Sequence, residues 1–177
     1  MIRRGVRGDV AAAVAILRAV AEEYVTRGTP IWNPASFDEH DYADAARRGE
    51  LVLGYDGSQA VATMLLQSHD PLFWPDDTNG EARYLHKLAV VAEARGCGWS
   101  ERLVAWARGE ALRAHARFLR LDTAPRPRLI ALYQRYGFVL VDTTPRRFGE
   151  TLAVRLQLPL DVLGAKTNAD EIGWNPP

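Results

Sequence analysis

A glycine-rich segment at a junction between an expected strand and an expected helix constrains this chain more than any other feature. It reads Ala94-Arg95-Gly96-Cys97-Gly98-Trp99-Ser100, after an apolar stretch that ends at Val91 and before a helical pattern that runs to about His115. Glycine lets the backbone approach a ligand closely, and the first N–H groups of a helix are unpaired donors with a partial positive charge. The segment therefore predicts either a pyrophosphate-binding loop, with Arg95 adding a charged contact, or a tight turn with a surface arginine.

Two common nucleotide-binding motifs do not match this segment. A Walker A loop ends in Gly-Lys-Ser/Thr, whereas this one ends in Gly98-Trp99-Ser100. A Rossmann fingerprint needs a third glycine where Glu101 stands, and its first glycine follows the strand at once. Asp122 stands where a ribose-binding acid would be, but only 55 residues follow it in the 177-residue chain. That length is too short for a complete doubly wound sheet.

The periodicity of apolar residues predicts one α/β domain, of the α+β type with a mixed sheet, over residues 1–160. Alternation predicts strands at 2–7, 51–55, 60–67, 83–91, 118–122, 138–141 and 151–158. Helices are expected after Asp9 as an N-cap, at the capping box that begins at Ser36, after Gly98, and at Pro127. The expected architecture is a sheet of about seven strands flanked by helices, followed by a polar tail over residues 161–177.

Charge and cysteine content exclude several classes of protein. Lys plus Arg and Asp plus Glu are equal at 22 each, whereas a nucleic-acid-binding protein normally carries a basic excess. The single cysteine, Cys97, excludes an internal disulfide and a zinc site with several cysteines, and we expect no metal. No apolar run approaches the ~18 residues of a membrane helix, and the first residues lack a signal-peptide core. We therefore expect a cytoplasmic protein, monomeric or homodimeric, with no nucleic-acid or membrane partner.

Three ordered segments together resemble the GCN5-related N-acetyltransferase (GNAT) superfamily. They are Leu88-Ala89-Val90 at the end of a strand, Arg95-Gly96-x-Gly98-x at the start of a helix, and Leu132-Tyr133-x-x-x-Gly137-Phe138 about 40 residues later. The resemblance extends from about Arg3 to Leu158. It implies a GNAT-like fold, acetyl-CoA as cofactor, and a V-shaped splay between the strands at 83–91 and 118–122.

The resemblance also implies where the cofactor lies. Pantetheine would follow the backbone of Leu88, Ala89 and Val90, and the pyrophosphate would contact Arg95, Gly96, Cys97, Gly98, Trp99 and Ser100. Many relatives carry an asparagine after the fifth strand that helps to hold the cofactor. Arg126 takes that position in this chain.

Acetyl transfer to an amine requires a base and benefits from an acid. His86 is the leading base, because imidazole titrates near neutral pH. Strand alternation would put Tyr84, His86, Leu88 and Val90 on one face. The segment around His86 also resembles serotonin N-acetyltransferases, in which the matching histidine belongs to a proton path. The GNAT pattern makes Tyr133 the leading acid, near the cofactor sulfur. The alternative for both residues is a structural role in the core.

The acceptor side is expected to include Trp32 and the long loop over residues 68–80. Within that loop, Trp74, Asp76 and Asp77 could bind a cationic amine through carboxylate charge and cation–π attraction. The alternative is a solvated acidic loop over a surface tryptophan. The sequence thus favours an enzyme that moves an acetyl group from acetyl-CoA to a primary amine of a small molecule. Acetylation of a protein N-terminus or lysine, and a non-catalytic acyl-CoA- or drug-binding module, are the alternatives.

Overall fold

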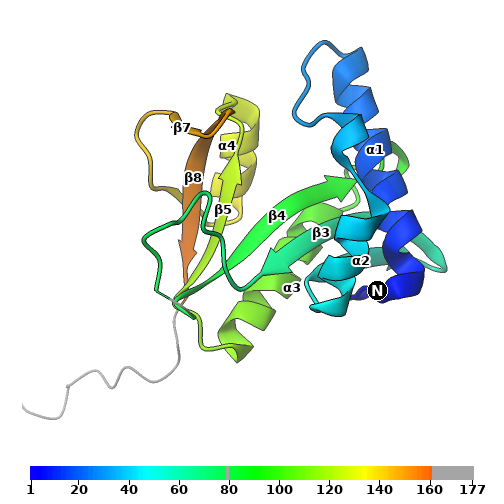
Figure 1. Ribbon diagram of the computed structural model, residues 1–177, viewed down its shortest axis with the longest axis horizontal. Coiled ribbons are helices and arrows are strands. Elements are labelled where there is room, and N and C mark those ends of the chain that lie inside the picture. Colours follow the sequence, from blue (N-terminus) through cyan, green and yellow to red (C-terminus); the bar gives the residue numbers. More distant parts are fainter. Residues whose placement is uncertain (79, 161–177) are drawn as a thin grey trace, which may run out of the picture.

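A computed structural model describes residues 1–78 and 80–160 (Figure 1). The predicted tail at 161–177 lies outside the described residues. In chain order the elements are β1 (Ile2–Arg4), α1 (Val10–Thr26), α2 (Glu39–Arg47), β2 (Leu51–Asp56), β3 (Gln59–Gln67), β4 (Ala82–Val90), α3 (Trp99–Arg113), β5 (Phe118–Thr123), α4 (Pro127–Arg135), β6 (Val139–Leu140), β7 (Arg146–Phe148) and β8 (Thr151–Pro159). Short 3₁₀ turns occupy Arg7–Asp9, Pro34–Ser36 and Ala92–Ala94.

The strands form one mixed sheet in the order β1-β2-β3-β4-β5-β8-β6, and β7 pairs with β8. Every neighbouring pair is antiparallel except β4 and β5, which run parallel. That parallel pairing covers only Ala82–Leu85 against Phe118–Leu121. Beyond it the two strands diverge, as Figure 1 shows. The V-shaped splay expected from the resemblance is therefore confirmed.

Helices cover both faces of the sheet. On one face, α1 and α2 pack over a core that includes Leu51, Leu53 and Ala89. On the other face, α3 and α4 pack over Val52 and Leu85. The alternation of Leu51, Val52 and Leu53 between the two cores is the period-two pattern of a strand that is buried on both sides.

The sheet has eight strands in the described residues, rather than the seven that the sequence predicted. The additional strand is β7, which forms a hairpin with β8 through a turn at Gly149, where φ is +58°. Its three residues are too few to show a period in the sequence.

Two predicted helix caps differ from the structure. Asp9 precedes α1, but its carboxylate accepts no hydrogen bond from the helix. It accepts instead from the Val6 N–H at 2.7 Å and from Arg3 at 2.6 and 2.8 Å. The second helix begins at Glu39 rather than near Ser36, because the Asp38 carboxylate accepts from the His40 N–H at 2.6 Å and caps α2.

Within the described ranges, no helix is both long enough and apolar enough to cross a membrane.

A glycine on β2, Gly54, makes room for the start of α3. A Cβ atom placed on Gly54 would lie 2.9 Å from two ring carbons of Trp99, the first residue of α3. Trp99 is only 5% exposed, so its ring cannot move outward without losing its packing. Gly54 therefore makes the space that lets the glycine-rich loop and α3 sit against the sheet.

We predict that Gly54→Ala lowers the free energy of unfolding by about 1–3 kcal/mol, because it overpacks a filled core. Chemical denaturation measures the change. Gly8→Ala is the matched control, since a Cβ at Gly8 meets no atom within 4 Å. Equal stability of the Gly54 variant and the wild type would contradict this account of Trp99.

Candidate active site

A bulge in β4 sets which side chains face the space between the strands. Thr63 of β3 pairs with Ala89 and Leu65 pairs with His86, so β4 has one more residue than β3 in this interval. Lys87 lies in the bulge with φ of +53°, a conformation that is rare for a residue with a side chain. A bulge reverses the alternation of the residues that follow it.

Because of the bulge, the residues after His86 lie on a different face of β4 from the one that the sequence predicted. His86 and Lys87 both point toward the α1–α2 connection and the loop over 68–80: His86 contacts Asp70, and the Lys87 amine lies over the Trp32 ring. Leu88 and Val90 pack with the core beneath α3. The prediction that His86, Leu88 and Val90 share one face is therefore wrong beyond His86.

The parting of β4 and β5 opens into a central cavity of about 480 Å³. Residues from both strands, from α4, from the loop over 68–80 and from the α1–α2 connection line it. The titratable and aromatic lining residues that can bind or act on a cationic amine are Trp32, Asp70, His86, Lys87, Asp122 and Tyr133. The structure thus brings both predicted catalytic residues and one of the predicted acceptor-binding residues, Trp32, to one cavity.

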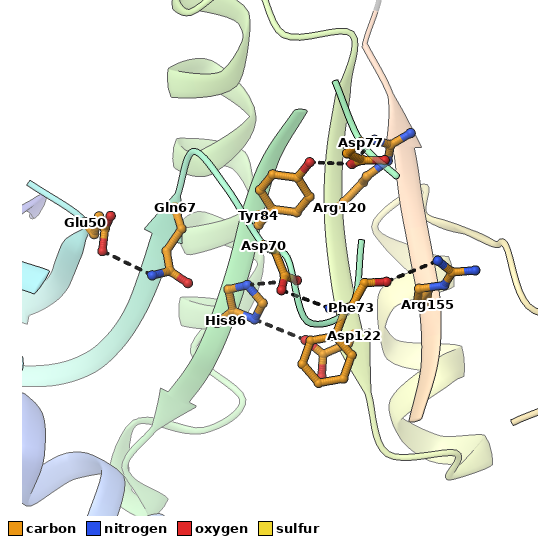
Figure 2. A network of polar contacts seen from close by, with 10 residues as sticks. All are labelled: Glu50, Gln67, Asp70, Phe73, Asp77, Tyr84, His86, Arg120, Asp122 and Arg155. Atoms are coloured by element: carbon orange, nitrogen blue, oxygen red, sulfur yellow. Dashed lines mark hydrogen bonds and ion pairs between the residues drawn. The ribbon is translucent and has the colours of Figure 1, made fainter. Parts of the chain in front are cut away.

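His86 lies between two carboxylates, as Figure 2 shows. Its Nδ1 atom is 3.1 Å from Oδ1 of Asp122 on β5, and its Nε2 atom is 3.4 Å from Oδ2 of Asp70 on the loop. The three side chains are 13%, 18% and 6% exposed, respectively. Among the described residues, His86 Nε2 and Asp70 Oδ2 are buried atoms without a hydrogen-bond partner. The two atoms lie 3.4 Å from each other, and each has hydrogen-bonding capacity that no other described residue uses.

Burial raises the pKa of the Asp70 carboxyl above its ordinary value. Two interactions act in the opposite direction: the nearby His86 and the hydrogen bond that the Phe73 N–H donates to Asp70 Oδ1 at 3.1 Å. Desolvation is the largest of these effects. An ionised Asp70 is therefore held in the cavity at a cost to the fold.

The same three residues have the side chains of a metal site. One ligand atom from each of Asp70, His86 and Asp122 lies within 4.8 Å of the others. However, the shortest contacts of the two carboxylates go to different imidazole nitrogens. These contacts suit a shared proton, and the three ligand atoms are also close enough together to surround a cation.

The loop that carries Asp70 is held against β5 and β8. The guanidinium carbons of Arg120 and Arg155 lie 4.5 and 4.8 Å from the centre of the Trp74 ring. The Asp77 carboxylate accepts from the Tyr84 hydroxyl and from Arg120 (Figure 2). These contacts fix the end of the loop and thereby the position of Asp70.

The contacts of the loop also locate the remaining predicted acceptor-binding residues. Trp74 is buried, with 5% exposure, and Asp77 belongs to the ion pair with Arg120, so both lie away from the lining of the cavity. Asp76 is exposed on the loop surface. In this structure the loop presents Asp70 to the cavity, and Trp74 and Asp77 anchor the loop.

The glycine-rich loop borders a second groove of about 480 Å³ between the start of α3 and the end of α4. Gly96 and Gly98 have φ values of +78° and +76°, which glycine adopts without strain. A Cβ on Gly96 would meet no atom within 4 Å, so the space above the loop is open. Val90 lines this groove and Leu88 lines the central cavity, so β4 runs from one to the other.

Two arginines that were predicted to contact the cofactor bind other parts of the protein. Arg95 forms two hydrogen bonds of 2.6 Å with the Glu23 carboxylate of α1. Arg126 donates to the carbonyl oxygens of Thr29 and Pro30, at 2.8 and 2.6 Å, from the opposite side of the splay. Cys97 is exposed between the two glycines.

Tyr133 lies in α4 at the edge of the cavity, and its side chain packs edge-on against Phe138 with ring centres 5.9 Å apart. Burial, followed by the negative charge of nearby Asp122, raises the pKa of the Tyr133 hydroxyl. A tyrosine hydroxyl, with an ordinary pKa of about 10, carries its proton at neutral pH, and the raised pKa makes it a weaker acid. Tyr133 can therefore act as a proton donor.

Sequence reasoning did not assign Asp70, Lys87 or Asp122 to this site. Asp122 could have been found, because it ends the strand next to His86 in a parallel pair. Lys87 was visible beside His86, but the bulge that turns it toward the cavity depends on pairing with β3. Asp70 carries no local signal, since its position is set by the distant arginines that bind the loop.

Known proteins match both the sequence and the fold. A sequence model of the acetyltransferase (GNAT) family matches residues 17–138. The uncharacterized N-acetyltransferase YesJ of Bacillus subtilis (strain 168) is 30% identical over 137 residues, which cover 73% of this chain and 76% of YesJ.

Two solved structures share the fold at lower sequence identity. The structure of yncA from Salmonella typhimurium, solved with its cofactor acetyl-CoA, has a TM-score of 0.70 and 17% identity, and covers 93% of this chain and 96% of that chain. The PaiA N-acetyltransferase from Thermoplasma acidophilum, in complex with coenzyme A, has a TM-score of 0.70 and 13% identity. The match covers 90% of this chain and 98% of that chain.

We predict that Asp70→Asn raises the free energy of unfolding at neutral pH by roughly 0.5–2 kcal/mol, as stabilising changes at functional sites often do. Because its pKa is raised in the folded state, the ionised carboxyl opposes folding above the unfolded pKa of about 3.9. The gain should shrink as the pH falls through the raised pKa of the folded state and be lost below the unfolded value, where the carboxyl is protonated in both states. Denaturation at several pH values measures it. Asp76→Asn, an exposed change in the same loop, serves as the control, and a less stable Asp70 variant at neutral pH would refute the prediction.

Proposed function

The chain belongs to the acetyltransferase (GNAT) family, and on that premise we propose that it transfers an acetyl group from acetyl-CoA to a primary amine of a small molecule. One observation carries the proposal: His86, which lines the central cavity, has one ring nitrogen against Asp122, while the other, Nε2, is a buried atom without a hydrogen-bond partner among the described residues. This is the arrangement of a general base held by a carboxylate.

The second groove fits the pyrophosphate of the cofactor. Gly96 and Gly98 have the left-handed conformations of a phosphate-binding loop, and the space above Gly96 is open. The backbone of Arg95 to Ser100 would hold the phosphates, and β4 at Leu88, Ala89 and Val90 would hold pantetheine. Acetyl-CoA supplies an acetyl group that is already activated as a thioester. Since the Arg95 side chain pairs with Glu23, backbone N–H groups are the expected phosphate donors.

His86 would remove the proton of the acceptor ammonium. Donation from Nδ1 to Asp122 would leave the lone pair on Nε2, which lies 3.4 Å from Asp70 Oδ2. The carboxylate also holds the ring in one orientation. General bases of this kind typically contribute about 10²–10⁴-fold to the rate.

The two carboxylates would act before and after that proton transfer. Asp70 Oδ2 lies beside Nε2 and has no other partner in the described residues, so it can bind the cationic amine as it arrives. Once Nε2 is protonated, the imidazolium lies between the charges of Asp70 and Asp122, which stabilise it. The ring of Trp32 at the cavity wall can add cation–π attraction for the amine.

Tyr133 would supply the proton that completes the reaction at the cofactor end of the cavity. Its hydroxyl carries a proton at neutral pH, as the ordinary pKa of a tyrosine, about 10, implies. Tyr133 belongs to α4 and His86 to β4, and both side chains line the same cavity. The base and the acid are therefore separate groups that do not compete for one proton.

The size of the cavity supports a small-molecule acceptor. A volume of about 480 Å³ falls within the ~300–1,000 Å³ of common small-molecule sites. The test is an assay of purified protein with acetyl-CoA and a panel of primary amines, in which release of the free thiol is measured. A short peptide library with free N-termini and lysines is run beside it. Turnover of peptides alone would assign the protein-directed alternative, and acetyl-CoA binding without turnover would assign the non-catalytic one.

Tyr133→Phe is predicted to keep its affinity for acetyl-CoA and to lower kcat by roughly 10- to 10³-fold, since only the proton donor is lost. Calorimetry and steady-state kinetics separate the two effects. Tyr55→Phe removes a hydroxyl that binds Asp9 outside the cavity, so it should leave kcat unchanged. A fully active Tyr133 variant would assign the hydroxyl to packing alone.

His86→Gln is predicted to lower kcat/KM by about 10²- to 10⁴-fold and to flatten the acid limb of its pH profile, because no imidazole remains to be protonated. His40→Gln, on the exposed surface of α2, is the control and should keep both the rate and the limb. If the acid limb persists in the His86 variant, another group, such as Asp70, carries the titration.

A further inference from the structure

Lys87 is a half-buried cation in the central cavity that the proposed chemistry does not use. It lines this cavity and also an adjoining groove of about 290 Å³ beside α2. No carboxylate lies within 4.0 Å of its amine in residues 1–78 and 80–160. A buried charge is normally paired, so the position calls for a partner from outside the chain.

The bulge and two aromatic rings fix the position of this amine. Lys87 adopts φ of +53°, which puts its side chain on the cavity face beside His86. Its Nζ atom lies 5.3 Å from the centre of the Trp32 ring and 5.9 Å from that of Phe37. The rings hold the ammonium group by cation–π attraction but offer no anionic atom to it.

The charged neighbours of Lys87 form no ion pair with its amine in the part of the chain that the structure describes. In the adjoining groove, Arg48 pairs with Glu50 at 2.9 Å, and Gln67 donates to the same carboxylate at 3.1 Å (Figure 2). Asp41 also lines that groove. Asp122 attracts the ammonium from the cavity, although burial has the larger effect and lowers the pKa of Lys87.

The cavity thus has two poles of opposite charge. Asp70 and Asp122 surround His86 at one pole, and Lys87 forms the other. Consecutive Cα atoms are about 3.8 Å apart, and the bulge turns His86 and Lys87 to the same face. One small molecule can therefore contact both poles at once.

Resting on the proposed function, we propose that Lys87 binds an anionic group of the acceptor, so that the enzyme acetylates amines which also carry a carboxylate or a phosphate. The ammonium group of the acceptor meets Asp70 and His86, and its anion forms a charge-assisted hydrogen bond with the Lys87 amine between the rings of Trp32 and Phe37.

The experiment compares matched acceptors with the wild-type enzyme. The pairs are γ-aminobutyrate and its amide, β-alanine and β-alaninamide, and O-phosphoethanolamine and ethanolamine. The anionic member of at least one pair should have a kcat/KM roughly 10- to 100-fold higher, as for one charge-assisted hydrogen bond. A preference in the carboxylate pairs or in the phosphate pair identifies which anion the site takes.

Variants assign the preference to Lys87. Lys87→Met keeps an unbranched side chain that is one atom shorter and has no charge, and it should reduce the preference to within a few-fold by slowing the anionic member alone. Lys87→Arg keeps the charge and should retain part of the preference. As a readout without turnover, calorimetry should show that N-acetyl-γ-aminobutyrate binds the wild type more tightly than the acetylated amide does, and that Lys87→Met removes the difference.

The outcomes separate this inference from the proposed function. Equal turnover of both members of every pair by the wild type overturns the role of Lys87 and leaves the amine acetyltransferase in place. A preference that survives in Lys87→Met also overturns it. If no amine of any pair is acetylated and neither product binds, the small-molecule acceptor and this inference fail together.

Discussion

The site depends on the point at which β4 and β5 stop pairing. Leu85 and Leu121 form the last backbone pair of this parallel ladder. The next residues are His86 and Asp122, and their side chains, rather than their backbones, make the following contact, at 3.1 Å. The hydrogen bond that orients the imidazole is therefore also the first contact inside the fork between the strands. Because β4 and β5 run parallel, their C-terminal ends lie at the same edge of the sheet. The two strands diverge toward that edge, and a ligand can enter between them.

The loop over 68–80 shows how the fold supports an unfavourable group. Asp70 is only 6% exposed, and this burial raises its pKa, with a smaller contribution from the nearby Asp122 carboxylate. The ionised Asp70 therefore opposes folding. The opposing force comes from Trp74 and Asp77, which bind Arg120 and Arg155 on the far strands. Stability is thus gained at the anchors and lost at the cavity, and the two belong to one short segment. This distribution is typical of functional sites, where the geometry needed for chemistry is not the most stable one.

The sequence predicted most of the fold and part of the site, and the differences have physical causes. Alternation and caps located the main strands and helices because those signals are local. Gly96 and Gly98 were identifiable for the same reason, since their backbone conformation is a property of the residue itself. The bulge at Lys87 was not, because it exists only through the pairing of β4 with β3. Trp74 and Asp77 were interpreted as acceptor-binding residues, since an aromatic ring and a carboxylate suit a cationic ligand. Their actual partners are arginines of this chain. Arg120, for example, lies 46 residues after Trp74 and 43 residues after Asp77, so no local pattern shows the contact.

The hydrogen bonds of Arg126 have a topological consequence. They join the N-terminal end of α4 to the carbonyl oxygens of Thr29 and Pro30. Ile31 and Trp32 follow on one rim of the cavity, and Thr123 and Ala124 precede on the other. The arginine therefore links the two rims of the cavity on one side of the opening. The rims cannot move apart there without breaking both of these hydrogen bonds.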